Sequence, residues 1–221
     1  TIVTEDNWRD NYIPKGEPTT FDISVFAMAK YPITNAQFEE FVTVGGYQHK
    51  SWWTDAGWEQ REREKWTAPR NWADNQLKGD QQPVVGVSWY EAVAFCRWLS
   101  EVVGKTILLP TEQQWQRAAW ALPDGEYSGY TYVWGNKWNG DTCHHSVKPH
   151  KSNQSSLITA YESRGNISPC GVVGMTGNVW EWCLTAYETG SQEVDGTDAR
   201  ILRGGSWLTD HPHYFRIVSR Y

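Results

Sequence analysis

The segments GMTGNVWEWC at 174–183 and ILRGGSWLTDHPHYFRIVSRY at 201–221 are both dense in glycine and aromatic residues. Glycine permits tight turns, and tryptophan supplies a large rigid ring with one polar N–H group. The whole chain has 15 Trp but only two Met among its 221 residues. The composition therefore predicts a core of large, rigid, amphipathic rings, each of which needs a partner for its N–H group when it is buried.

Composition and charge exclude several classes of protein. The formal net charge of −6 disfavours a nucleic-acid binder that works through phosphate contacts. No run approaches 18 apolar residues, so no membrane insertion is expected, and the N-terminus lacks the pattern of a signal peptide. The cellular location stays open. The cysteines are too few for a disulfide scaffold: Cys96, Cys143, Cys170 and Cys183.

Capping signals predict three helices. Thr34 precedes a short helix, Ser88 forms a capping box with Glu91, and Thr111 forms another with Gln114. The second of these helices is expected to end at a glycine in position 104. Its expected buried face consists of Ala92, Phe95, Cys96 and Leu99.

The remaining segments predict short strands and long loops. Alternating residues favour one or two strands within 21–33, and a short strand is expected at 106–110. The polar, Trp-rich stretch 48–82 is expected to be irregular. The charge run EQREREK at 59–65 within it is interpreted as a solvated helical turn. Few helices with short strands indicate a mixed α+β fold. We expect an N-terminal arm at 1–20 and one domain at 21–221.

The residues give no recognisable catalytic or metal motif. The chain has no P-loop, dinucleotide fingerprint, H-E-x-x-H or G-x-S-x-G pattern. Cys143, His144 and His145, with His150 nearby, are the only metal-like group, but structural zinc uses two spaced pairs of ligands. We therefore expect no catalytic residue, no metal and no cofactor.

Ordered motifs carry a resemblance to a known family. They are YPITNAQFEEF at 31–41, PVVGVSWYEAVAFCRWLS at 83–100, LPTEQQWQRAA at 109–119, YVWGN at 132–136, GMTGNVWEW at 174–182 and LRGGSW at 202–207. Together they resemble the formylglycine-generating enzyme/sulfatase-modifying factor family. The resemblance implies a C-type lectin-like α+β fold, with two or three helices around short antiparallel strands and long loops. Such a scaffold carries several unrelated functions, so it does not imply an activity.

The cysteine pattern bears on the activity that the resemblance implies. Formylglycine-generating enzymes use a copper-binding cysteine pair shortly after the GGS motif, whereas no cysteine follows Cys183 here. Thr, Asp or Tyr cannot replace a thiolate. Iron-dependent sulfoxide synthases of the same family need a three-histidine site from an extra helical domain, for which this chain shows no segment. We therefore expect that the protein is not an enzyme.

The calcium sites of the family are expected to be degraded. The position equivalent to Gly174 is commonly Asp or Asn in relatives and binds the ion. Glycine supplies no side-chain ligand, which leaves Glu181 and backbone carbonyls as a poor set for Ca²⁺. The second calcium-binding loop should fall near 139–146, where no convincing ligand set aligns. An arginine is the natural candidate for the partner of Glu181, and the survival of a residual Ca²⁺ site near it stays open at this point.

The C-terminal segment resembles the variable proteins of diversity-generating retroelements, which use the same lectin-like domain. They end in RGGSW, variable positions around a fixed proline, and R-x-x-x-R, and 202–221 matches this form. Adenine-directed mutagenesis of Asn codons reaches all of the candidate variable residues. The resemblance implies these ligand contacts: Leu208, Thr209, Asp210, His211, His213, Tyr214, Phe215, Ile217, Val218, Ser219 and Tyr221.

A binding function follows from this segment. It mixes rigid aromatic anchors with adaptable polar groups, as antibody paratopes do, and the expected partner is a protein or cell-surface ligand. The tryptophans among the framework residues are expected to be buried. The framework consists of Trp180, Glu181, Trp182, Arg203, Gly204, Gly205, Trp207, Arg216 and Arg220.

Three alternatives remain at this stage. The protein could be an undiversified scaffold domain of a signalling protein, or a formylglycine-generating type of oxidase. The apolar members of the C-terminal segment could also be core residues of the last strands: Leu208, Phe215, Ile217 and Val218.

Overall fold

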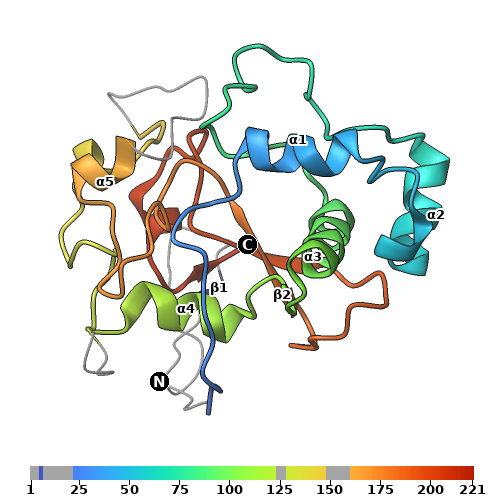
Figure 1. The fold of residues 1–221 in the computed structure, drawn as a ribbon. Coiled ribbons are helices and arrows are strands. Elements are labelled where there is room, and N and C mark those ends of the chain that lie inside the picture. The colour runs from blue at the N-terminus through green and yellow to red at the C-terminus, as the bar shows by residue number, and fades with distance from the viewer. Residues whose placement is uncertain (1–4, 7–21, 123–127, 148–159) are drawn as a thin grey trace.

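Helices lie around two small pairs of strands in the computed structural model of the protein (Figure 1), which confirms a mixed helix and strand fold. The structure describes residues 5–6, 22–122, 128–147 and 160–221, so most of the arm expected at 1–20 lies outside the described residues. Among the described residues, no helix has the length and apolar character needed to cross a membrane. The α-helices are α1 (Asn35–Thr43), α2 (Asp55–Glu64), α3 (Trp89–Val103), α4 (Glu112–Trp120) and α5 (Ala160–Arg164).

The strands bring the end of the chain into the middle of the fold. Antiparallel β2 (Glu181–Ala186) and β3 (Arg200–Arg203) form one pair, and β1 (Glu5–Asp6) and β4 (Ser219–Arg220) form a parallel pair. Leu202 of β3 also exchanges two backbone hydrogen bonds with the last residue, at 2.7 and 3.0 Å. The C-terminus therefore lies against β3, near the centre of the view in Figure 1.

The three expected helices begin at the capping residues that the sequence predicts. The hydroxyl oxygens of Thr34, Ser88 and Thr111 accept hydrogen bonds from backbone N–H groups three residues further on, at 3.3, 3.2 and 3.1 Å. Glu91 and Gln114 accept from the backbone N–H groups of their cap residues, at 2.7 and 2.9 Å. These reciprocal bonds satisfy donors that have no partner within the helix.

Two segments that were expected to form strands do not form them. The described part of 21–33 and the segment 106–110 belong to no strand. At the second of them, one backbone bond of 2.8 Å runs from the N–H of Leu184 to the carbonyl of Pro110. A strand needs a ladder of successive bonds to one neighbour, so a single bond leaves the segment as a connection.

The stretch 48–82 is more regular than expected. It contains the whole of α2, where only a turn was expected at 59–65. The hydroxyl of Thr54 accepts a bond of 3.0 Å from the N–H of Gly57 at the start, and Lys65 ends the helix in the left-handed conformation. Because α2 is charged on most sides, apolar periodicity could not reveal it.

The buried face of α3 differs in part from the expected one. Phe95 and Cys96 are buried as expected, whereas Ala92 and Leu99 are half-buried. The ring of Phe95 stacks on Phe38 of α1, with the ring centroids 5.0 Å apart. Aromatic rings from the two helices thus fill the space between α1 and α3.

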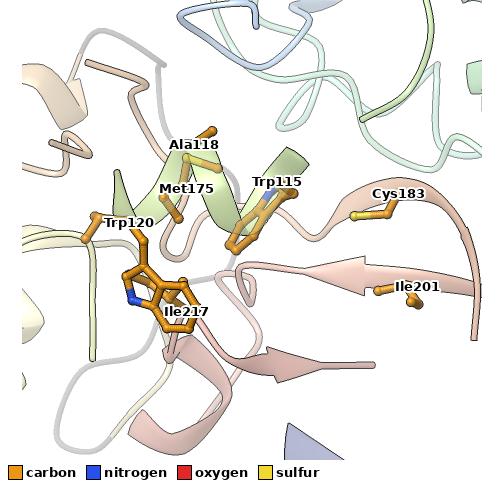
Figure 2. Close-up of a cluster of buried hydrophobic side chains, with 9 residues drawn as sticks. Trp115, Ala118, Trp120, Met175, Cys183, Ile201 and Ile217 are labelled. Carbon is orange, nitrogen blue, oxygen red and sulfur yellow. The ribbon is translucent and has the colours of Figure 1, made fainter. Parts of the chain in front are cut away.

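A second buried cluster joins α4, β2, β3 and the C-terminal segment (Figure 2). Trp115 of α4 lies at its centre and is 1% exposed. Because the cluster joins these elements with the loops that carry Val133 and Met175, packing on α4 fixes where the C-terminal segment lies. The cluster consists of Trp115, Ala118, Ala119, Trp120, Val133, Met175, Cys183, Ile201 and Ile217.

Gly205 offers a test of this packing. Its φ is 78°, and a Cβ atom there would lie 2.6 Å from the Phe215 ring. We expect Gly205→Ala to combine backbone strain of about 1–2 kcal/mol with overpacking of about 1–3 kcal/mol, measured by urea unfolding. Gly190→Ala is the matched control, because its φ is 71° but no atom lies within 4 Å of the new Cβ. Equal losses of stability in the two variants would contradict the close approach to Phe215.

Candidate functional site

Two glycine turns hold the start of the C-terminal segment. The N–H of Gly177 donates to the carbonyl of Gly204 at 2.7 Å, and the N–H of Trp207 donates to the carbonyl of Asn178 at 2.8 Å. Gly204 has a φ of 93°, in the left-handed region that favours glycine. The GNVWEW and RGGSW motifs therefore meet through their backbones.

A third segment fixes the loop that follows. The N–H of Ser146 donates to the carbonyl of Thr209 at 2.8 Å, and its hydroxyl donates to the carbonyl of Trp207 at 2.7 Å. The hydroxyl of Thr209 accepts from the N–H of Ser206 at 3.0 Å. Thr209 is thus tied into the loop, although sequence reasoning placed it among the ligand contacts.

Exposed side chains along this loop form what we call the C-terminal surface. Leu208 is 66% exposed, and Asp210 and His211 are exposed as well. The 3-10 helix Pro212–Phe215 follows and leaves two further side chains half-buried. The C-terminal surface consists of Leu208, Asp210, His211, His213, Tyr214 and Tyr221.

Phe215, Ile217 and Ser219 are core residues, which corrects their expected place among the ligand contacts. Their side chains are 0–1% exposed. The ring of Phe215 packs against Trp138, with centroids 5.1 Å apart, and the hydroxyl of Ser219 donates to the carbonyl of His213 at 2.7 Å. The core alternative is right for Phe215 and Ile217, and half-buried Val218 packs against the cluster around Trp115 to which Ile217 belongs.

Leu208 shows the opposite outcome. The alternative that made it a core residue is wrong, because it is one of the most exposed large apolar side chains among the described residues. Alternation along a strand cannot describe this loop, where turns decide which side chains face inward.

The histidines of the C-terminal surface lie next to each other. The ring centroids of His211 and His213 are 6.2 Å apart. The backbone N–H of His213 donates to Nδ1 of the His211 ring at 3.2 Å. Partial burial lowers the pKa of His213, and the charge of Arg216 and the neighbouring His211 lower it further. These effects favour the uncharged form of the His213 imidazole.

The tryptophans of the framework are less buried than expected. Trp180, Trp182 and Trp207 are each half-buried. The indole N–H of Trp182 donates to the carbonyl of Val87 at 2.9 Å. These three rings are partly open to solvent, whereas rings such as Trp115 fill the interior.

One of these rings packs against the last residue of the sequence. Trp180 stacks on Tyr221, with centroids 5.6 Å apart and an angle of 27° between the rings. Tyr221 is 49% exposed, so this stack reaches solvent at the end of the chain.

A buried ion pair lies beneath the segment. Arg203 is fully buried and donates to Glu112 of α4 at 2.6 Å. Its other guanidinium nitrogen donates to the carbonyls of Ile217 and Ser219, at 2.9 and 2.7 Å. Nε of Arg220 lies 3.2 Å from the same carboxylate oxygen of Glu112. The two framework arginines thus bind one carboxylate, which sequence reasoning missed because Glu112 appeared only as a helix residue.

The expected arginine partner of Glu181 is therefore wrong. Its carboxylate accepts a hydrogen bond of 2.5 Å from the indole N–H of Trp115. Burial raises the pKa of Glu181 to about 7, and this hydrogen bond opposes the rise. Glu112 takes the arginine because it is placed between both guanidinium groups.

The metal-like group at 143–145 is engaged inside the protein. Both ring nitrogens of buried His145 form hydrogen bonds, to the carbonyl of Gly140 at 3.1 Å and from the N–H of Val147 at 2.9 Å. His150 lies outside the described residues. In the part of the chain that the structure describes, no three His, Cys, Asp or Glu side chains form a group that could hold an ion.

The cysteines are all free. Cys96 and Cys143 are buried, and burial raises the pKa of each thiol to about 12. Burial also raises the pKa of the Cys183 thiol, whereas Cys170 is exposed. Three of the four side chains are therefore protonated thiols in the interior, away from the C-terminal surface.

Comparison with known proteins identifies the family. Residues 4–220 match the family described as FGE-sulfatase, the sulfatase-modifying factor enzyme 1-like domain. The chain belongs to this family. The FGE-sulfatase match spans nearly the whole chain, which confirms the family that the ordered motifs indicated.

Named relatives correct one expectation. Hercynine oxygenase of Mycobacterium tuberculosis is 32% identical over 212 residues, covering 86% of this chain and 47% of that protein. A formylglycine-generating enzyme of Streptomyces coelicolor is 33% identical over 178 residues, covering 70% of this chain and 52% of that protein. Because these relatives are enzymes, the expectation that the protein is not an enzyme is wrong, although another relative is named as inactive.

The remaining comparisons concern length, fold and origin. The chain spans about half the length of the hercynine oxygenases it matches. The structure of PvdO from Pseudomonas aeruginosa has a TM-score of 0.59 at 17% identity, covering 87% of this chain and 72% of that chain, which supports the fold alone. The comparisons give no support to an origin in a diversity-generating retroelement.

Glu112 provides a test of the buried ion pair. We expect Glu112→Gln to leave Arg203 charged and buried without its carboxylate, which lowers the free energy of unfolding by about 3–5 kcal/mol. Chemical denaturation at pH 7 measures the loss. Glu62→Gln removes an exposed ion pair with Arg61 and should change stability little. Similar losses in both variants would show that burial of the pair has no consequence.

Glu181 predicts a pH dependence of stability. Its pKa is raised in the folded state, so the folded protein binds its proton more tightly than the unfolded chain does. The resulting stabilisation is fully present below about pH 4.5 and is lost as the pH rises through about 7. Glu181→Gln should remove this contribution, as seen by urea unfolding at several pH values between 4.5 and 7.5. Parallel pH profiles for the two proteins would contradict the assignment.

Proposed function

We propose that this chain is the substrate-binding domain of an oxygenase of the hercynine-oxygenase kind, and that it binds its ligand at the C-terminal surface. The observation that carries the proposal is the 32% identity to a hercynine oxygenase over 86% of the chain. The match covers only 47% of that relative. The oxygenase activity of a longer protein that contains this chain is therefore proposed together with the binding site.

The cysteines favour this function over formylglycine generation. The resemblance implies a copper-binding cysteine pair shortly after the GGS motif, where residues 207–221 contain no cysteine. Thiolates, not protonated buried thiols, are nucleophiles and copper ligands. Cys96, Cys143 and Cys183 are buried with raised pKa values, so they cannot supply that chemistry.

The C-terminal surface suits a small polar ligand. Trp180 and Tyr221 offer stacked aromatic rings, Asp210 an exposed carboxylate, and His213 an imidazole whose lowered pKa favours its uncharged form. The backbone beneath them is fixed by hydrogen bonds to Ser146 and to the glycine turns. A fixed backbone that presents polar and aromatic groups is typical of a binding site.

The iron that the resemblance implies for such oxygenases does not fit the described residues. A three-histidine site needs three imidazoles around one ion, and no such group exists in the ranges that the structure covers. His145 already uses both ring nitrogens. The proposal therefore assigns ligand binding to this domain and assigns no reaction step to a metal.

The binding of hercynine to the intact chain tests the proposal. Isothermal titration calorimetry should give saturable binding, accompanied by a change in tryptophan fluorescence because Trp180 stacks on Tyr221 of the surface. We expect Tyr214→Ala and His213→Ala each to weaken binding at least 10-fold while leaving the melting temperature nearly unchanged. His49→Ala is the matched control, since His49 is an exposed histidine outside the C-terminal surface.

Two results would overturn the proposal. Absence of binding at millimolar hercynine would contradict the choice of ligand. Binding that is unchanged in both surface variants would contradict the choice of site.

A further inference from the structure

The corner around Glu181, where the GNVWEW motif enters β2, is the place at which the family resemblance implies a calcium ion. Calcium takes six to eight oxygen ligands at about 2.3–2.6 Å. The residues of this chain do not fit that requirement, as the contacts of the carboxylate and of the preceding loop show.

The carboxylate of Glu181 is already bound within the protein. The indole N–H of Trp115 donates to it at 2.5 Å, and Trp115 is held in the core with 1% exposure. Glu181 is also paired with Arg203 in the β2–β3 register, which fixes its backbone. A hydrogen-bond donor thus already occupies one of the two carboxylate oxygens of Glu181.

The backbone carbonyl groups of residues 176–178, in the loop before Glu181, accept hydrogen bonds from other groups of the protein. The carbonyl of Thr176 accepts from the side-chain amide of Asn166 at 2.6 Å, and that of Gly177 accepts from the N–H of Val179 at 3.0 Å. The carbonyl of Asn178 accepts from the backbone N–H of Trp207 at 2.8 Å. Three successive carbonyl groups are thereby engaged inside the fold.

Position 174 offers no side-chain ligand to complete a set. Gly174 has a φ of 83°, and a Cβ there would find only the ring of Pro32, at 3.9 Å. Position 174 therefore adds no oxygen ligand from a side chain. A single carboxylate with engaged carbonyls is far short of the coordination that Ca²⁺ needs.

We propose that this corner is closed without calcium: the indole N–H of Trp115 serves as the partner of Glu181, and the stability of the domain does not depend on Ca²⁺. The ties from the loop to Trp207 and from β2 to Arg203 then hold the C-terminal surface without an ion. The indole ring of Trp115, which donates to Glu181, belongs to the buried apolar cluster, so the hydrogen bond links this corner to the core.

Thermal unfolding of the intact chain tests this proposal. A ligand that binds only the folded state raises the melting temperature with its concentration. We expect melting temperatures in 2 mM EDTA and in 5 mM CaCl₂ to agree within about 1 °C, with 5 mM MgCl₂ as the control for ionic effects. Calorimetric titration of the EDTA-treated chain with CaCl₂ should show no saturable heat.

Two variants separate the hydrogen bond from an ion. Trp115→Phe keeps an aromatic ring but removes the N–H group, and we expect a lower melting temperature that is identical with EDTA and with CaCl₂. Glu181→Gln keeps an acceptor for Trp115 and should fold. The proposal is overturned if CaCl₂ raises the wild-type melting temperature saturably by more than about 3 °C and Glu181→Gln abolishes that rise. These outcomes do not depend on hercynine binding, so the two proposals can fail separately.

Discussion

The buried contact of Arg203 with Glu112 is the constraint on which the C-terminal part of the domain depends. Charges that leave water need partners of good geometry, and Glu112 receives Arg203 and lies next to Arg220. Arg203 also donates to the backbone carbonyls of Ile217 and Ser219. Helix α4, strand β3 and the end of the chain must therefore meet at this point, and the apolar cluster around Trp115 packs beside it.

Two functions of the C-terminal segment follow from this anchoring. Its buried members, such as Phe215 and Ile217, hold it to the core, while Leu208, Asp210 and His211 face solvent. The segment thus contributes both to the core and to the surface, and residues close together in sequence differ in which of the two they face. Substitution of the outward side chains would therefore disturb the core less than substitution of the inward ones.

Hydrogen bonds donated by tryptophan indoles link segments that regular secondary structure leaves unconnected in this domain. The indole N–H groups of Trp115 and Trp182 reach a carboxylate and a carbonyl that lie far away in sequence. Short strands leave many backbone and side-chain groups without a ladder, and burial requires that each finds a partner. This explains why a loop-rich domain carries 15 Trp.

The sequence by itself determined the starts of three helices and the family. Capping boxes such as Ser88 with Glu91 depend on residues three apart, and the ordered motifs identify the family from residue order alone. Only the tertiary structure decided the partner of Arg203, the burial of Phe215, Ile217 and Ser219, and the exposure of Leu208. Those outcomes depend on contacts between segments that are distant in sequence and on loop turns, where no short period predicts which side chain faces inward.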